Sequence, residues 1–122
     1  MKKIFCFGNE FVKQDSLAKE VVDELKIQGV EFVKCSSVDG LLNEKGDLVI
    51  LDVVKGINEV ITFNDLNRLK NKKICSLHDF DVAFFLKLMK ELKQINKIII
   101  IGIPQQGDKE KIKSQLRDLL PI

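Results

Sequence analysis

The chain has 122 residues, enough for one hydrophobic core, so we expect a single domain covering residues 1–122. Its composition, 45% hydrophobic and 31% charged residues, excludes an intrinsically disordered protein. The net charge of +2 indicates no general affinity for nucleic acid or an anionic membrane, and the longest apolar run, residues 98–103, is too short to cross a bilayer.

The first half of the chain contains three apolar segments that predict strands and one amphipathic segment that predicts a helix. The expected strands are residues 3–7, 30–35 and 47–53, and the expected helix is residues 15–28. The helix carries apolar side chains at helical spacing and is followed by Gly29, a typical C-terminal stop. Residues 36–46 are rich in turn formers, with room for one helical turn at Leu41.

The second half begins with a turn and a short strand, within residues 56–63, that we expect at an edge of the sheet. A broad apolar face predicts a helix for residues 79–93, and continuous apolar character predicts a strand for residues 97–102. A final helix opens at residues 107–108 and is stopped by Pro121.

Three cysteines, Cys6, Cys35 and Cys75, are scattered along the chain and form no Cys-x-x-Cys pair. This usage predicts reduced, buried thiols in a cytoplasmic protein rather than a disulfide framework or a thiolate zinc site. The basic and apolar start of the chain ends at Gly8, too soon for a signal peptide, and is interpreted as the first strand. Because the predicted apolar stripes all face the core, we expect a monomer.

Strands that alternate with helices predict an α/β fold. Two of the strands are apolar enough to be covered on both faces, which predicts a three-layer α/β/α sandwich with a mostly parallel sheet, of the phosphorylase/hydrolase-like kind. Right-handed crossovers place the carboxyl ends of the strands along one edge of such a sheet, and ligands bind outside these ends. Polar residues that end or follow the strands are therefore the candidates for a site.

Three polar residues stand at this edge: Asp15 after the first strand, Asp52 at the end of the strand 47–53, and His78 at the start of a helix. Two carboxylates and an imidazole can hold a divalent transition metal, or can perform general acid–base catalysis without one. Each also has a structural explanation, Asp15 as a helix N-cap, Asp52 as the start of a turn and His78 as a surface residue. The chain contains no phosphate-binding loop after its first strand and no Gly-x-Ser-x-Gly nucleophile elbow.

Four segments occur in an informative order. They are residues 8–18 (Gly-Asn-Glu-Phe-Val-Lys-Gln-Asp-Ser-Leu-Ala), 48–54 (Leu-Val-Ile-Leu-Asp-Val-Val), 76–78 (Ser-Leu-His) and 101–104 (Ile-Gly-Ile-Pro). In this order they resemble the signatures of the hydrogenase maturation proteases, the nickel-dependent processing endopeptidases. That family has a Gly-Asn-x-Leu-x-x-Asp-(Asp/Glu)-x-x-Gly loop after its first strand, a later strand ending in Asp-Ala-(Val/Ile), and a Ser-x-His at a helix start.

The resemblance implies that Asp15, Asp52 and His78 bind metal, with Asp15 and Asp52 as the catalytic carboxylates of a metal-dependent, aspartic-type endopeptidase. The implied reaction removes a C-terminal peptide from the large-subunit precursor of a nickel-iron hydrogenase. Nickel carried by the precursor would serve as the recognition element, with zinc or another divalent metal as a substitute in vitro. A metal so placed could polarise the scissile carbonyl or activate a water molecule, and the sequence leaves both open.

The substrate peptide is expected to lie against the opening loop. Gly8 and Asn9 would shape its floor, and Phe11 is the apolar residue expected to lie exposed beside the site. Gln14 stands where the family has the first acid of a pair, which favours an alternative: a non-catalytic member that binds a metal or a partner. Peptidyl-tRNA hydrolases also place Gly-Asn after the first strand, but they need a histidine soon after it, whereas the single histidine here is His78.

Overall fold

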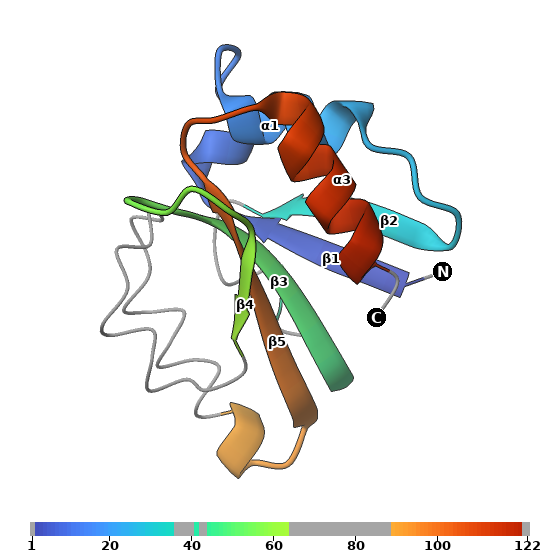
Figure 1. Ribbon diagram of the computed structural model, residues 1–122. Helices are drawn as coiled ribbons and strands as arrows, with labels where there is room; N and C mark the ends of the chain where they lie inside the picture. The colour runs from blue at the N-terminus through green and yellow to red at the C-terminus, as the bar shows by residue number, and fades with distance from the viewer. Residues whose placement is uncertain (1, 36–40, 42–43, 64–88, 121–122) are drawn as a thin grey trace.

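The computed structural model describes residues 2–35, 41, 44–63 and 89–120 (Figure 1). Within this part of the chain, five strands form one sheet in the order β2-β1-β3-β5-β4. The strands are β1 (Lys2–Phe7), β2 (Val30–Cys35), β3 (Gly46–Val54), β4 (Ile61–Phe63) and β5 (Ile95–Pro104). The helices that the structure describes from end to end are a single 3-10 turn, η1 (Asn9–Phe11), and the α-helices α1 (Leu17–Glu24) and α3 (Lys109–Leu119).

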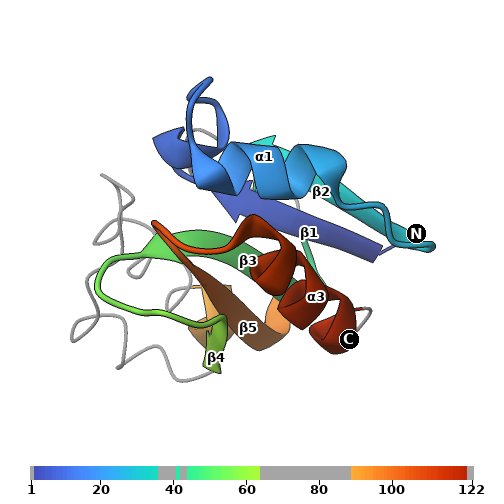
Figure 2. The ribbon, with the colours of Figure 1, turned by 45° about the horizontal axis from the view of Figure 1, so that its top comes forward.

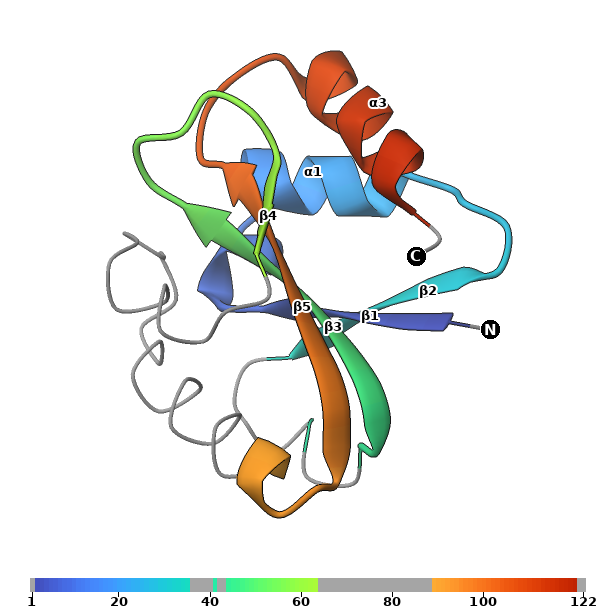
Figure 3. The same cartoon turned by 60° about the horizontal axis from the view of Figure 1, so that its bottom comes forward.

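The sheet is parallel except for β4, which pairs antiparallel with β5 at one edge. Phe5 of β1 lies beside Ile50 of β3, and β3 continues beside β5 as far as Val54 and Pro104. The carboxyl ends of β1, β3 and β5 therefore lie at one edge, and Figure 3 shows the arrowheads of β3 and β5 on the same side of the molecule. The predicted α/β fold with a mostly parallel sheet is confirmed, including the edge strand.

Alternate residues of each strand point to opposite faces of the sheet, and apolar side chains are buried on both faces. α1 and α3 cover one face, as Figure 2 shows. The core beneath them contains residues of β1, β3, β5 and both helices: Ile4, Cys6, Ala18, Val21, Val49, Leu51, Val53, Ile101, Ile103, Ile112 and Leu116. The second face buries another cluster: Phe5, Phe7, Leu41, Leu48, Ile50, Met89, Ile98 and Ile100. Of the helix predicted for residues 79–93, the structure describes only residues 89–93, in which 89–91 are helical and 92–93 form a turn.

α1 is shorter than the predicted helix 15–28. It begins after Ser16, whose side-chain hydroxyl accepts a hydrogen bond from the N–H of Lys19 at 3.3 Å and so forms the N-cap. It ends at Glu24, because Leu25 takes an extended conformation that buries its side chain in the core. Tertiary burial of Leu25 thus ends the helix before Gly29 is reached.

The other predicted elements agree with the structure to within a few residues. β2 occupies the predicted residues 30–35, and β5 extends beyond 97–102 at both ends. α3 begins after its N-cap Asp108, whose carboxylate accepts a hydrogen bond from the N–H of Glu110 at 3.0 Å. None of the helices in the described ranges combines the length and the apolar character that crossing a membrane requires.

Candidate functional site

Asp52 is the polar residue that β3 brings to the carboxyl edge of the sheet. Its side chain is only 7% exposed. Its neighbours Leu51 and Val53 belong to the core beneath α1 and α3, so Asp52 points to the opposite face. The carboxylate oxygen Oδ1 accepts a hydrogen bond from the N–H of Val53 at 2.7 Å. The backbone at the end of β3 therefore holds a buried carboxylate in place.

The loop after β1 begins at Gly8, whose φ of +114° suits glycine. The N–H of Gly8 donates to the carbonyl of Cys35 at 3.2 Å, which ties the loop to the end of β2. Asn9 then opens η1. Both residues lie at the carboxyl edge, next to the end of β1, and their role in substrate binding stays a prediction.

Phe11 does not lie exposed, so that expectation is wrong. Its side chain is fully buried in the core beneath α1 and α3. The short helix η1 turns the ring inward, and the exposed apolar residue of this loop is its neighbour Val12, at 57%. Phe11 therefore anchors the loop to the core instead of offering a surface to substrate.

Asp15 lies in the turn before α1, on the surface of the protein. It is not the N-cap, because Ser16 fills that position. The structural explanation of Asp15 is thus removed, while its carboxylate remains exposed on the segment that leads from the carboxyl edge of the sheet to α1. The cap signal was present in the sequence as a serine directly before the first apolar residue, Leu17.

The metal-binding trio is only partly described, because His78 and the neighbouring Ser76 lie outside the described residues. In the part of the chain that the structure covers, no group of three His, Cys, Asp or Glu side chains could hold a metal ion. The carboxylates of Asp52 and Asp15 are suitable oxygen donors for a divalent ion, but two carboxylates need a further ligand to form a site. His78 or a group of the substrate would have to supply it.

Cys6 and Cys35 are free and buried, as predicted, whereas Cys75 lies outside the described residues. Burial raises the pKa of the Cys6 thiol far above its usual value, and the neighbouring Cys35 raises it further. Burial also raises the pKa of Cys35, to which Glu44 adds. Thiols with raised pKa values are poor nucleophiles, so neither cysteine is suited to covalent catalysis.

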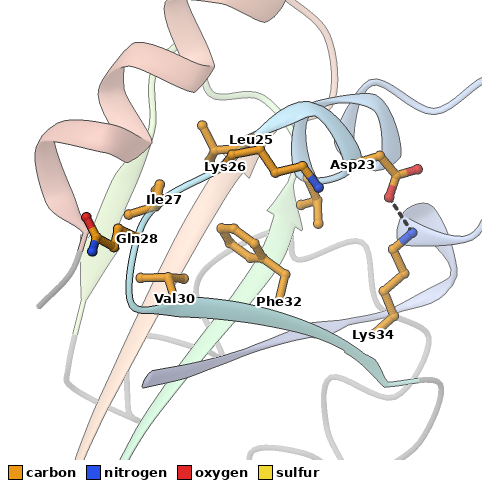
Figure 4. Close-up of a pocket in the computed structure, with 9 residues that line it drawn as sticks. Asp23, Leu25, Lys26, Ile27, Gln28, Val30, Phe32 and Lys34 are labelled. Atoms are coloured by element: carbon orange, nitrogen blue, oxygen red, sulfur yellow. Dashed lines mark hydrogen bonds and ion pairs between the residues drawn. The ribbon is translucent and has the colours of Figure 1, made fainter. Parts of the chain in front are cut away.

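A hollow of about 460 Å³ lies elsewhere, between the end of α1 and the edge strand β2 (Figure 4). The side chains of Val30 and Phe32 rise from β2 toward the connection from α1. An ion pair of 2.7 Å between Lys34 and Asp23 crosses its rim. Asp15 and Asp52 do not line this hollow, so it is separate from the carboxyl-edge site.

Comparison with known proteins identifies the family of the chain. Residues 35–120 match the family model described as hydrogenase maturation protease, a range that includes Asp52 and His78 and begins after the loop of Asp15. None of the curated proteins matches the chain in sequence.

Two solved structures share the fold over 98% of this chain. One is the [NiFe] hydrogenase maturation protease HybD from Thermococcus kodakarensis, with a TM-score of 0.64, 17% identity and 96% of that chain covered. The other is the hydrogenase maturating endopeptidase HybD from E. coli, with a TM-score of 0.63, 15% identity and 90% of that chain covered. At these identities the likeness shows that the fold is shared.

Proposed function

The chain belongs to the hydrogenase maturation protease family, and from this premise we propose that it removes a C-terminal peptide from the large-subunit precursor of a nickel-iron hydrogenase. The precursor is then both its partner and its substrate. We further propose that it works in the cytoplasm as a monomer. The free thiols of Cys6 and Cys35 suit a reducing compartment.

The observation that carries this proposal is the buried carboxylate of Asp52 at the carboxyl edge of the sheet. A carboxylate is costly to bury, and the hydrogen bond that it accepts from the N–H of Val53 offsets part of that cost. Residues kept buried at such an edge, where α/β sheets bind their ligands, are functional candidates. Asp52 also lies within the range that matches the family.

Nickel enters this proposal as cargo of the precursor. The oxygen donors of Asp52 and Asp15, with the imidazole of His78, form a ligand set that suits a divalent transition metal. A bound metal can polarise a carbonyl or lower the pKa of a bound water. The task of this chain's own residues is to hold the nickel-bearing region of the precursor against the carboxyl edge, so that the scissile peptide is oriented for cleavage.

Replacement of Asp52 tests the function. We expect Asp52→Asn to lower the rate of precursor cleavage by on the order of 10²-fold or more, because the carboxylate is lost while the side-chain volume is kept. Cleavage of nickel-loaded and nickel-free precursor is followed by mass spectrometry, and nickel-dependent complex formation by calorimetry. Asp47→Asn is the matched control, since Asp47 is exposed at the opposite end of the same strand. If the Asp52→Asn variant cleaves the precursor at the same rate as the wild-type protein, the proposal is contradicted.

The second candidate function is binding without catalysis. It is favoured by Gln14, which stands in place of a family acid and is exposed next to Asp15. On this alternative, the wild-type chain forms a stable complex with nickel-loaded precursor and releases no peptide. Gln14→Glu then provides a direct comparison, because restored cleavage in this variant would identify the missing acid as the cause.

A further inference from the structure

Gly102 of β5 lies directly beside the candidate residue Asp52 of the adjacent strand β3. It is the pairing partner of Asp52 between β3 and β5, so both residues point to the same face of the sheet. Ile61 of β4 pairs with Gly102 from the other side. Gly102 therefore has Asp52 of β3 on one side and Ile61 of β4 on the other, near the carboxyl end of β5.

The neighbours of Gly102 occupy the space that a side chain would need. A Cβ atom at this position would lie 2.6 Å from Cγ2 of Val54 and 3.2 Å from Cγ1 of Ile61. The first distance is shorter than real Cβ atoms adopt. Gly102 is absent from the residues with positive φ, so its backbone would accept alanine. Glycine is therefore required here for space.

Val54 has little freedom to give way. It is β-branched, which restricts its χ1 rotamer, and it is only 1% exposed. A displacement of its Cγ2 would therefore move the backbone at the end of β3. That backbone includes the N–H of Val53, which holds the carboxylate of Asp52 at 2.7 Å.

We propose that Gly102 is a positioning residue for Asp52, acting through Val54. Its missing side chain lets Val54 pack over β5, and this packing fixes the direction of the Val53 N–H that orients the carboxylate. The catalytic consequence rests on the proposed protease function, whereas the effect on the geometry of Asp52 does not. Gly102→Ala should displace the end of β3 and misplace the carboxylate, and a misplacement of about 1 Å can cost on the order of 10²-fold in rate.

A set of three variants tests this proposal in the full chain: Gly102→Ala, Val54→Ala and the double variant. The first readout is the backbone amide resonance of Val53 in ¹H–¹⁵N spectra, which reports its hydrogen bond to Asp52. The second is kcat/KM for cleavage of nickel-loaded precursor. We expect Gly102→Ala to shift the resonance and lower kcat/KM by about 100-fold. In the double variant the smaller alanine at position 54 leaves room for the new Cβ. Its Val53 resonance should match that of Val54→Ala alone, and its kcat/KM should lie within about threefold of that variant's value.

Loss of stability has to be separated from loss of position. Ile112→Val removes one methyl group from α3, in the core on the face of the sheet opposite to Asp52, and should lower the melting temperature without moving the Val53 resonance or kcat/KM. If Gly102→Ala alone does not fold, the comparison of Val54→Ala with the double variant decides. A further loss of about 100-fold in that comparison overturns the proposal.

The two proposals fail in different ways. An unshifted Val53 resonance in Gly102→Ala overturns the positioning role, whatever the enzyme does. A wild-type chain that does not cleave the precursor overturns the protease function, while a shift in Gly102→Ala that reverts in the double variant still supports the positioning role.

Discussion

At the scale of single residues, Asp15 and Ser16 are neighbours in the loop before α1, but only Ser16 has a structural role in the helix. The hydroxyl of Ser16 caps the helix, whereas the carboxylate of Asp15 is exposed and takes no part in the cap. A side chain that satisfies a free helix N–H contributes to stability, and an exposed carboxylate in a turn contributes little. The proposed role of Asp15 therefore predicts a clean separation of stability from activity.

We expect Ser16→Ala to lower the free energy of unfolding by about 0.5–2 kcal/mol, because the N–H of Lys19 loses its partner. Asp15→Asn should change it by less than about 0.5 kcal/mol and yet reduce cleavage of the precursor. Urea denaturation and peptide release measure the two effects. A large loss of stability in Asp15→Asn, with normal cleavage, would contradict the assignment.

At the scale of elements, charged side chains fasten α1 to α3. The carboxylate of Glu24, at the end of α1, contacts Nζ of Lys109 at 2.9 Å and Nζ of Lys113 at 3.2 Å. These hydrogen bonds lower the pKa of Glu24 and raise that of Lys109. Both helices cover the same face of the sheet, so this contact links them at its surface. Because Glu24 is exposed, salt will weaken the contact.

The lowered pKa of Glu24 sets the sign of a pH dependence. In the unfolded chain, glutamate takes up a proton near its ordinary pKa of about 4.3, whereas the folded protein does so at lower pH. The stabilisation is therefore present above the unfolded pKa and is lost as the pH falls through the folded pKa. Glu24→Gln should be less stable than wild type near neutral pH, and the difference should shrink on acidification.

Urea denaturation of wild type and Glu24→Gln, at neutral and acidic pH and at two salt concentrations, measures this difference. Glu31→Gln is the control, since Glu31 is exposed on the edge strand β2 and should affect stability by less than about 0.5 kcal/mol at either pH. A difference that grows as the pH falls would have the wrong sign for this explanation.

At the scale of the whole molecule, we expect the centre of the sheet to be the most protected part of the described residues. β1, β3 and β5 are buried on both faces, whereas β2 and β4 form the edges of the described sheet. Opening the central strands requires the loss of both apolar clusters, and so approaches global unfolding. The end of β3, which carries Asp52, would then be attached to the most stable part of the described sheet.

Native-state hydrogen exchange tests this distribution. We expect the slowest amides in the middle of β3 and β5, around Val49 and Ile99, with opening free energies near the global value. Amides of β4, a strand of three residues at the edge, should exchange faster. Equal protection in β3 and β4 would show that the edge opens only with the whole domain.

The sequence by itself predicts the order of the described elements, the mostly parallel sheet and the place of Asp52. The apolar runs of β1, β3 and β5 are local signals, because a strand covered on both faces needs continuous apolar character. The break of such a run by one aspartate, Asp52, is equally visible without a structure. The family resemblance adds the expected reaction, and the match of residues 35–120 supports membership of the family.

Other features were decided only by the tertiary structure. The burial of Phe11 depends on whether η1 turns the ring toward the core, and the end of α1 depends on the burial of Leu25. The need for glycine at position 102 arises from Val54 and Ile61, which are far away in the chain. Local propensity cannot encode these outcomes, because each is set by the shape of neighbours that only the assembled sheet brings into contact.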